Sequence, residues 1–357
     1  MDAFKPKPED IVHVSAEALR PALEGLFRSA GEPEEAAQRA ADVLLQADLR
    51  AVESHGVSNM MKIYLDEYAE GTLVARAQWE VERERAATAT INANLAHGLV
   101  IAPIAMQMAI EKARAGGLGA VTVHNAGHLG MAAYHAMLAL PEDMVGVCMT
   151  AAGASVLPTF GREPRLGTNP IAIAAPAGSE RPFVLDMATS VVPVNKVRNT
   201  RRAGHLLPAG IIAGADGTPI LEPVAVPDPF LLLPLGSARA SGSHKGYGLA
   251  AAVETLCSIL SGAGYATVLP RTYYRHFLMA INIDAFTEIS RFKELMDGYI
   301  RDLHATPPAA GHERVLVAGE PEWDSHAERS RDGIPLHKDV VAWLRAECAT
   351  RAVPLSI

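Results

Sequence analysis

Apolar residues in the first part of the chain recur at helical spacing. Ser15 stands where it can cap a first helix that ends at Gly31, and Pro33 occupies an expected N1 position of a second helix. The second helix leaves its charged residues on one side and gathers apolar ones on the other, namely Ala36, Ala40, Val43, Leu44 and Ala47. A third amphipathic stretch runs up to Gly71 and contains Met60, Ile63, Tyr64 and Tyr68. Residues 1–75 are therefore predicted to form an all-helical N-terminal lobe that packs with C-terminal segments.

The pattern changes after residue 75 to short apolar segments with breaks between them. Residues 81–94 alternate like a strand, and residues 101–117 have the periodicity of a helix that ends at two glycines. Short apolar runs flanked by Gly, Pro or polar residues predict buried strands at GAVTVHN, MVGVCMT, NPIAIAAP and FVLDMATS. Residues 76–245 are therefore predicted to be a sheet-containing region.

The last third of the chain returns to helical patterns. Residues 198–243 are rich in Gly and Pro and predict extended loops and turns, and a long buried helix is predicted at 245–262. One more strand is predicted within HFLMAINID, near 277–283, before two further helical segments. We therefore predict a mixed α/β protein whose residues 246–357 form a helix-rich C-terminal region with one returning strand.

The usual nucleotide-binding turns are missing from the sequence. No G-x-G-x-x-G stands between a strand and a helix, and no G-x-x-x-x-G-K-[ST] occurs. The nearest approaches, GGLGAV at 116 and GAGYAT at 262, follow predicted helices rather than strands. A dinucleotide, if one binds, is therefore not held by the Rossmann turn.

Composition narrows the classes of partner. The 357 residues are 49% apolar and 20% charged, as in ordinary globular proteins, and the net charge of -8 argues against nucleic acid or an anionic membrane. The most apolar run, 246–264, is short for a membrane span and contains Glu254. The N-terminus lacks the apolar region of a secretory signal, and three scattered cysteines suit a reducing compartment. We expect a cytoplasmic protein with a small-molecule substrate.

Residues 54–56, SHG, carry the first candidate for chemistry. A histidine titrates nearest neutrality, so His55 suits proton transfer to or from a reacting oxygen. Ser54 would orient its ring, and Gly56 would let a substrate approach the backbone. Taken alone, the stretch is more often a helix C-cap, with the glycine in the left-handed conformation and the histidine interacting with the helix dipole.

The stretch HNAGHLG at 124–130 joins a predicted strand to a predicted helix, where backbone N–H groups can receive an anion. His124, His128 and His135 also raise the hypothesis of a metal site. No Asp or Glu in this stretch completes a ligand set, so we predict no metal.

Three further stretches are weak signals when taken singly. Asp186 ends an apolar strand, where it would either orient a histidine or serve as a turn or N-cap residue. His244 and Lys245 stand at a helix start and predict an anion cradle. The sequences GTNP at 167–170 and VAGEPEWD at 317–324 are typical of turns.

Together these stretches resemble the malate/L-lactate/L-sulfolactate dehydrogenase family of NAD(P)-dependent oxidoreductases, which also includes ureidoglycolate dehydrogenase, diketogulonate reductase and cyclic-imine reductases. The resemblance runs from about residue 40 to 340 through ADLRAVESHGVSNM, HNAGHLGMAAYHA, LGTNPIAIAAP, LDMATSVV, LLPLGSARASGSHKGYGLAAAVETL and RVLVAGEPE, in family order. It implies a non-Rossmann fold with NAD or NADP on a largely antiparallel sheet domain, within residues 76–245, and helical segments from both chain ends around it. It also implies a homodimer with its active site near the subunit interface.

The resemblance implies a role for each matched position. His55 matches the acid/base histidine, Asp186 the carboxylate that supports it, and His128 a histidine beside the nicotinamide. The implied substrate-binding positions are Ser54, Arg50, Asn59 and Thr168. The implied cofactor-binding positions, besides His128, are Gly130, Met187, Ala188, Thr189, Ser190, His244, Lys245, Gly319 and Glu320.

Four positions depart from the family pattern. The family often has Arg where Asn59 stands, and that Arg can pair with a substrate carboxylate; Arg50 is a candidate substitute. Thr150–Ala151 stands for Thr-Asn, Asn195 for the Gly before Lys196, and Ala318 for the Pro of P-G-E. These departures affect the expected substrate more than the expected acid/base.

The sequence therefore predicts an oxidoreductase that interconverts a small 2-hydroxy acid and its 2-oxo acid by hydride transfer, with a histidine acid/base. A first alternative is the reduction of a cyclic imino acid of the piperideine- or pyrroline-2-carboxylate type. A second is a non-catalytic NAD(P)-binding paralogue. A metal-dependent hydrolase is the least favoured.

Overall fold

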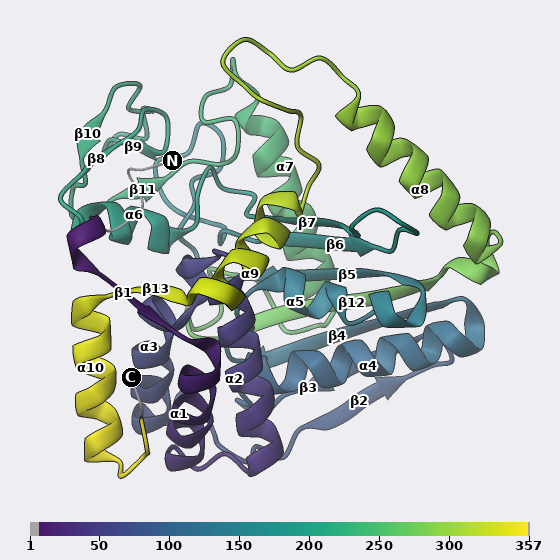
Figure 1. Ribbon diagram of the computed structural model, residues 1–357, viewed down its shortest axis with the longest axis horizontal. Helices are drawn as coiled ribbons and strands as arrows, with labels where there is room; N and C mark the ends of the chain where they lie inside the picture. Colours follow the sequence, from purple (N-terminus) through teal and green to yellow (C-terminus); the bar gives the residue numbers. More distant parts are fainter. Residues whose placement is uncertain (1–6, 356–357) are drawn as a thin grey trace.

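The computed structural model describes residues 7–355, and its N-terminal part is a layer of three helices (Figure 1). They are α1 (Ala16–Ser29), α2 (Glu34–Leu49) and α3 (Val57–Glu70). The Ser15 hydroxyl accepts the Ala18 N–H at 3.1 Å, which confirms the predicted cap, and Gly71 ends α3 with a φ of 75°. Pro33 is the N-cap of α2 rather than its first residue. Residues 1–6, part of the stretch used to predict the absence of a secretory signal, lie outside the described residues.

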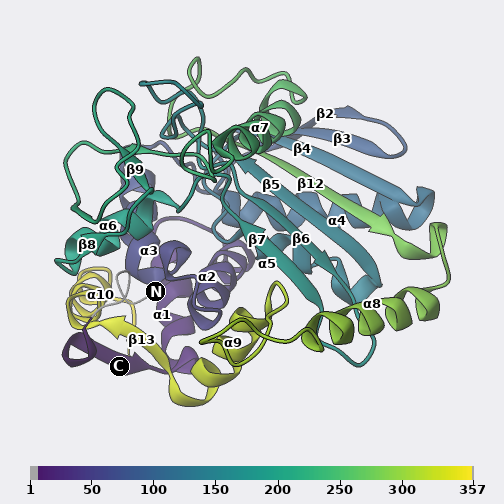
Figure 2. The same ribbon diagram turned by 90° about the horizontal axis from the view of Figure 1, so that it is seen from above.

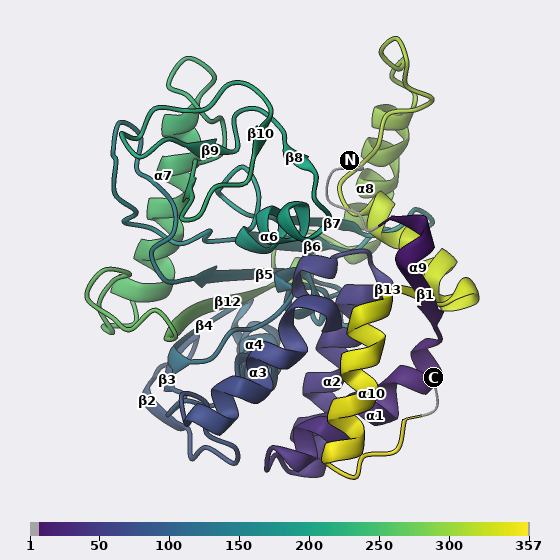
Figure 3. The same cartoon turned by 90° about the vertical axis from the view of Figure 1, so that its left-hand side faces the viewer.

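The prediction of an all-helical N-terminal lobe is wrong in one respect, because a strand precedes α1. Strand β1 (Ile11–Val14) pairs antiparallel with β13 (Ile334–His337), and α10 (Lys338–Thr350) follows β13. Figures 1 and 3 show α10 beside α1 and α3. The two chain ends share one buried cluster that includes Leu23, Phe27, Leu44, Tyr64, Leu336 and Leu344. The helical layer is thus completed by the C-terminus.

A seven-stranded sheet forms the centre of the molecule, in the order β2-β3-β4-β12-β5-β6-β7 (Figure 2). Its strands are β2 (Glu80–Glu84), β3 (Thr88–Asn92), β4 (Leu118–Ala126), β12 (Tyr274–Asn282), β5 (Met144–Ala151), β6 (Ile171–Ala175) and β7 (Phe183–Met187). The pair β3–β4 is parallel and the other neighbouring pairs are antiparallel. The class is mixed α/β, and the returning strand lies in the middle of the sheet. The single strand predicted for 81–94 is instead the hairpin β2–β3.

Helices cover both faces of this sheet. On one face α4 (Gly98–Gly116) packs on β4 and β12, and α5 (Ala132–Met137) packs on β5 and β6. On the other face lies α7 (Ser243–Glu254), which continues as a π-helical turn over Thr255–Ile259, and Figure 3 shows α7 and α4 on opposite sides. The prediction that this helix is buried is wrong for its outer side, where Leu249, Ile259 and Leu260 are 40%, 56% and 59% exposed.

The Gly/Pro-rich segment forms a small irregular layer beside the sheet. It contains α6 (Val194–Arg202) and two short ribbons, β8 (Leu206–Leu207) with β10 (Val224–Ala225) and β9 (Ile212–Ala213) with β11 (Leu231–Leu232). Its apolar cluster includes Val156, Val197, Leu207, Ile212 and Leu232. The prediction of loops and turns over 198–243 holds apart from the end of α6, which the sequence did not indicate.

The C-terminal part contains α8 (Ile289–His304) and α9 (Glu320–Asp332) before β13 and α10. The sequence predicted two helical segments after the returning strand. The described residues form three, α8, α9 and α10, because β13 separates α9 from α10. Within residues 7–355, no helix combines the length and the apolar character needed to cross a membrane.

Candidate active site

His55 lies in a tight connection between two helices of the N-terminal layer. Helix α2 ends at Leu49, a 3-10 turn spans Glu53–His55, and α3 starts directly after Gly56. The Ser54 Oγ lies 2.8 Å from His55 Nδ1, so the predicted orienting contact is present. Gly56 is extended, with a φ of -90°, and precedes a helix. The C-cap interpretation of SHG is therefore wrong.

The buried carboxylate of Asp48, in α2, explains why residue 56 is a glycine. A Cβ atom at Gly56 would lie 1.9 Å from Asp48 Oδ1, and the other carboxylate oxygen of Asp48 accepts the Val57 N–H at 2.8 Å. Asp48 thus caps α3 and fixes the turn that presents His55. The space at Gly56 serves this cap, and not the approach of a substrate as predicted.

Gly56→Ala is expected to lower the free energy of unfolding by roughly 1–3 kcal/mol, because the new methyl group displaces the Asp48 carboxylate. Urea denaturation measures the change. Gly298→Ala is the matched control, since Gly298 is an exposed residue of α8 with no atom near the Cβ position, and it should be neutral or slightly stabilising. Equal effects of the two substitutions would contradict the capping role.

Burial raises the pKa of Asp48 to about 7, against about 3.9 for an unfolded Asp. The folded state therefore binds this proton more tightly, so its stabilising effect is full below about pH 4 and is lost as the pH rises through about 7. Asp48→Asn keeps an oxygen for the Val57 N–H and removes the titration. We expect the variant's free energy of unfolding to fall less than that of the wild type between pH 4 and 7, as measured by urea denaturation. If the free energies of unfolding of the two proteins changed equally with pH, the raised pKa of Asp48 would be contradicted.

His128 follows β4 and stands across from His55. Its Nδ1 lies 3.2 Å from the Gly130 N–H and 2.7 Å from the Tyr64 hydroxyl. A backbone N–H can only donate, so Nδ1 is the acceptor and Nε2 carries the ring proton. The φ of 75° at Gly130 is left-handed and favours glycine there. His128 is thus set to donate a hydrogen bond.

The two imidazole rings lie together. Their centroids are 5.4 Å apart with planes 14° from parallel, and Tyr274 meets the His128 ring edge-to-face at 5.1 Å. Burial and then the charge of Lys196 lower the pKa of His55 to about 4, and burial also holds the pKa of His128 well below its usual value. Both rings are neutral at pH 7. One can accept a proton while the other donates a hydrogen bond.

Asp186 lies near the end of β7 and is attached to the segment after His128. Its carboxylate accepts the Ala133 N–H at 2.8 Å, in the first turn of α5. Dense surrounding protein and then Glu322 raise its pKa to about 7, although solvent still reaches the side chain. Among residues 7–355 its hydrogen bond is to Ala133 rather than to His55. Its predicted support of His55 stays a prediction.

Arg50 and Asn59 are both engaged by neighbouring protein groups. The Asn59 amide donates to the Glu53 carbonyl at 2.7 Å. The Arg50 guanidinium stacks on Trp323 of α9 at 3.9 Å, and burial lowers its pKa to about 10. The structure therefore places Arg50 against α9, a contact that the sequence did not indicate.

The strand-end segment Met187–Ser190 runs beside Thr168. The N–H and the hydroxyl of Thr189 donate to the Thr168 carbonyl at 2.9 and 3.0 Å, and Ser190 Oγ donates to the Val192 carbonyl. The structure thus brings together the predicted substrate position Thr168 and the predicted cofactor segment, in which Met187 and Ala188 are partly exposed.

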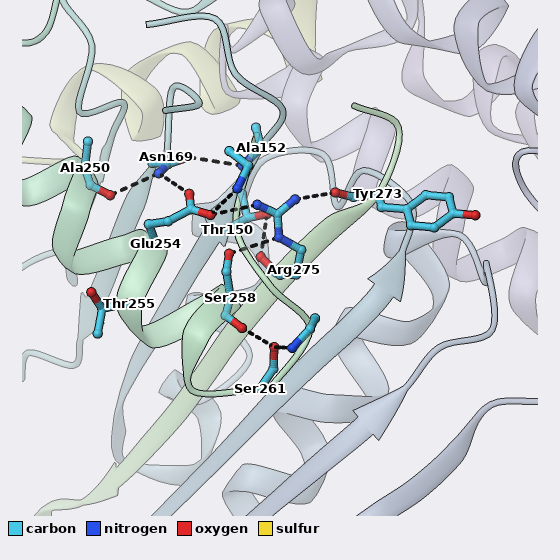
Figure 4. Close-up of polar contacts among 12 residues, drawn as sticks. Thr150, Ala152, Asn169, Ala250, Glu254, Thr255, Ser258, Ser261, Tyr273 and Arg275 are labelled. Carbon is cyan, nitrogen blue, oxygen red and sulfur yellow. Dashed lines mark hydrogen bonds and ion pairs between the residues drawn. The ribbon is translucent and has the colours of Figure 1, made fainter. Parts of the chain in front are cut away.

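A buried ionic network holds this region in place (Figure 4). Asn169 donates to the Ala250 carbonyl and to Glu254 and accepts the Ala152 N–H. Glu254 pairs with Arg275 at 2.9 Å, and both side chains are almost fully buried. Next along β12, His276 contacts Thr150 Oγ1 at 2.7 Å and the Gly127 carbonyl at 3.1 Å. The network therefore connects α7 and β12 to the segment that carries His128.

Basic side chains gather at the N-terminus of α7, where the sequence predicted an anion cradle. Gly242 precedes the helix with a φ of 99°, and no side chain caps this end. Arg239 donates to His244 Nδ1 at 2.9 Å, and Lys245 is exposed beside them. Basic side chains beside a helix N-terminus are donors that anions prefer, although the N–H groups of Ser243 and Lys245 already donate to the Ala238 and Gly242 carbonyls.

The predicted Gly-Glu turn lies against the first half of β7. A Cβ atom at Gly319 would lie 2.9 Å from Val184 Cβ, and the Glu320 carboxylate accepts the Val317 N–H and faces His304 at 2.6 Å. Glu320 is therefore occupied by the α8–α9 connection, and its cofactor role stays a prediction.

The histidines that raised the metal hypothesis have separate partners. His124 contacts Glu82 at 2.9 Å, and His135 donates from Nε2 to the Leu129 carbonyl. Within residues 7–355, no group of three His, Cys, Asp or Glu side chains is arranged to hold a metal ion.

The sequence missed two residues beside the two rings: Tyr64 contacts His128, and Tyr274 packs on it. Asn195, a departure from the family pattern, donates to the Ser54 carbonyl at 2.7 Å. Tyr64 was counted as an apolar residue of α3, and a buried tyrosine hydroxyl that needs a partner was the available signal.

Known proteins similar to this chain include several dehydrogenases. A family model described as malate/L-lactate dehydrogenase matches residues 14–345. The chain is 38% identical over 339 residues to a malate dehydrogenase of Pyrococcus abyssi, with 93% of each chain covered. It is 33% identical to an L-sulfolactate dehydrogenase of Methanothermobacter thermautotrophicus, over 92% of this chain and 94% of that one. The crystal structure of malate dehydrogenase from Entamoeba histolytica matches with a TM-score of 0.93 at 33% identity, over 97% of this chain and 100% of that one.

Proposed function

The chain belongs to the malate/L-lactate dehydrogenase family, and from this membership we propose that His55 is the acid/base of its reaction. It is an oxidoreductase that acts on the CH–OH group of a 2-hydroxy acid. The observation that carries the proposal is the stacked pair of neutral imidazoles, His55 and His128, at 5.4 Å.

The two histidines have complementary tasks in the oxidation of an alcohol. With Nδ1–H donating to Ser54 Oγ, the Nε2 lone pair of His55 accepts the hydroxyl proton as C=O forms. His128 Nε2–H donates a hydrogen bond to the same oxygen and orients it. A nicotinamide cofactor held beside these residues would supply the hydride chemistry, as acceptor in this direction and as donor in reduction.

Reduction of the 2-oxo acid needs His55 in its protonated form. The pKa of about 4 makes the imidazole neutral at pH 7 in the protein alone. A bound anionic substrate favours the charged form, since an opposite charge nearby raises the pKa of a histidine. Binding of the anionic substrate should therefore raise the pKa of His55 and favour the protonated form that donates the proton.

The dinucleotide is proposed to lie between the His128 loop and α7. Arg239, His244 and Lys245 would bind its phosphates, and Thr189 and Ser190 would line the nicotinamide end. Gly130, Met187 and Ala188 adjoin these positions in the chain.

We propose a cytoplasmic homodimer. The exposed apolar side of α7 and its continuation, with Leu249, Ile259 and Leu260, supports burial against a second copy. Three free buried cysteines support a reducing compartment. Analytical ultracentrifugation tests the dimer, and a monomer at micromolar concentration would contradict it.

The test of function is the loss of NADH or NADPH absorbance with a panel of 2-oxo acids and cyclic imino acids. The panel contains pyruvate, oxaloacetate, sulfopyruvate, diketogulonate and piperideine-2-carboxylate. We expect turnover of a 2-oxo acid with at least one cofactor, unchanged by EDTA. Turnover of the imino acid alone would favour the reductase alternative. Folded protein that binds neither cofactor would overturn the proposal.

A further inference from the structure

Tyr64 is a buried polar side chain beside the two imidazole rings. It lies in α3 with none of its surface exposed, and its hydroxyl is 2.7 Å from Nδ1 of His128. Burial raises the pKa of this hydroxyl well above its usual value, so the group keeps its proton and can donate it. A buried phenol needs such a partner. Within the described residues, the partner of Tyr64 is thus a ring of the candidate site.

Two donors meet at this nitrogen of His128. The Gly130 N–H reaches Nδ1 at 3.2 Å, and because an N–H group cannot accept, Nδ1 carries no proton and the Tyr64 hydroxyl must also donate to it. The hydroxyl contact of 2.7 Å has the usual length of an O–H hydrogen bond, whereas the N–H contact is at the long end of its range. Tyr64 is therefore the stronger of the two donors that leave the ring proton on Nε2.

The phenol ring is held in place by buried neighbours. The ring of His97 meets it edge-to-face, with centroids 4.3 Å apart and planes at 77°. His97 is itself fully buried, and its Nδ1 accepts the Leu99 N–H at 3.1 Å. Tyr64 cannot turn its hydroxyl away from His128 without displacing these close-packed groups. The donor is therefore in position before a substrate binds.

We infer that Tyr64 is a positioning residue of the reaction, which acts through His128. This inference rests on the proposed function, in which Nε2–H of His128 donates to the reacting oxygen. The Tyr64 O–H, the imidazole and this oxygen then form a chain of hydrogen bonds that point in one direction and polarise one another, so Nε2–H becomes the stronger donor. The effect grows as negative charge develops on the oxygen during reduction. Tyr64 should therefore act on turnover more than on substrate binding.

Tyr64→Phe removes the hydroxyl and keeps the ring against His97. We expect kcat for reduction of the 2-oxo acid to fall roughly 10-fold, the effect of about one hydrogen bond, with KM within about threefold of wild type. Tyr68→Phe is the matched control, because Tyr68 lies one turn further along α3 and its ring is also beside His97, at 5.7 Å. Its hydroxyl donates to Glu32 at 2.6 Å and not to a residue of the site, so its kcat should stay at the wild-type value.

A second readout does not need turnover. In NMR spectra of protein that carries isotopically labelled histidine, the ring nitrogens of His128 are assigned by the loss of their signals in His128→Gln. Near neutral pH the Nε2 signal should be that of a protonated nitrogen, and the Nδ1 signal that of a hydrogen-bonded acceptor. In Tyr64→Phe the Nδ1 signal should move toward the position of an unbonded imidazole nitrogen, and in Tyr68→Phe it should stay.

The outcomes separate this inference from the proposed function. If an active wild type had Tyr64→Phe and Tyr68→Phe variants of equal kcat, or if the Nδ1 signal behaved alike in both variants, the positioning role would be overturned and the proposed function would stand. A rise in KM at unchanged kcat would also overturn it, because the hydroxyl would then serve binding. A wild type that turns over no substrate would overturn the proposed function instead, and the Nδ1 signals would still decide whether Tyr64 holds this nitrogen.

Discussion

His55→Ala is expected to lower kcat for the oxidation of a 2-hydroxy acid by roughly 10²- to 10⁴-fold, the usual contribution of a positioned acid/base. Among the described residues, the polar contact of this side chain is to the adjacent Ser54, so its removal breaks no hydrogen bond to a distant part of the fold. The loss should therefore appear in turnover rather than in stability. Steady-state kinetics at saturating cofactor, together with urea denaturation, separates the two effects.

Two further variants make this result specific. His124→Ala removes a histidine of the HNAGHLG stretch that pairs with Glu82 at the edge of the sheet, and its kcat should stay within a few-fold of wild type. Ser54→Ala keeps the imidazole and removes its orienting hydroxyl, so an intermediate loss is expected. A His55→Ala enzyme with kcat within a few-fold of wild type would make the assignment wrong.

The pH profile of the wild type gives a complementary check on His55. In the oxidation direction, kcat/KM should fall at acid pH as His55 becomes protonated. The midpoint of this fall is expected well below pH 6.5, the ordinary pKa of a histidine, because burial and Lys196 lower the pKa of His55.

The parts of the fold that were predicted correctly depend on local signals. Ser15, Gly71 and the apolar periodicity specify the first three helices through capping and amphipathicity, which a sequence shows directly. The buried strands likewise follow from continuous apolar runs with breaking residues at their ends. Each of these signals is complete within about 15 residues.

Two errors in the fold have different causes, a distant partner in one case and an unusual turn in the other. Strands β1 and β13 have four residues each, and their pairing joins residues more than 300 positions apart. The β2–β3 hairpin turns at Arg85, Ala86 and Ala87, and none of these is a usual turn residue. The short strands therefore do not indicate their distant partner, and the residues between β2 and β3 do not indicate a hairpin.

In the candidate site, too, local motifs were predicted correctly and contacts with other parts of the fold were not. The SHG and HNAGHLG motifs identified His55 and His128, and the structure places the two rings together. The reason for Gly56 was missed because it depends on Asp48, eight residues earlier and buried beneath the turn. Arg50 was assigned to the substrate from sequence distance alone, whereas its direction is set by Trp323 of α9. Side-chain direction is therefore what the sequence could not supply.

The network in Figure 4 gives the second large effect, on stability. Arg275→Met is expected to lower the free energy of unfolding by about 3–5 kcal/mol, because the Glu254 charge loses its buried partner. Urea denaturation monitored by tryptophan fluorescence measures this change. The Asn169 and Ala266 donors to Glu254 remain, so the protein is expected to fold at low temperature.

The pairwise origin of this loss can be separated from the loss of a large buried side chain. In the double variant Arg275→Met/Glu254→Gln the buried charge is absent. The amide oxygen still accepts one of the two N–H donors, Asn169 or Ala266, which in the wild type reach different carboxylate oxygens, so stability should partly return. Arg291→Ala breaks an ion pair whose side chains are 57% and 69% exposed, and it should change stability by less than about 1 kcal/mol. If the double variant were no more stable than Arg275→Met, packing rather than charge pairing would be the contribution of Arg275. Partial recovery would instead mean that the charge of Glu254, buried between α7 and β12 beside Asn169, requires Arg275 to be tolerated there.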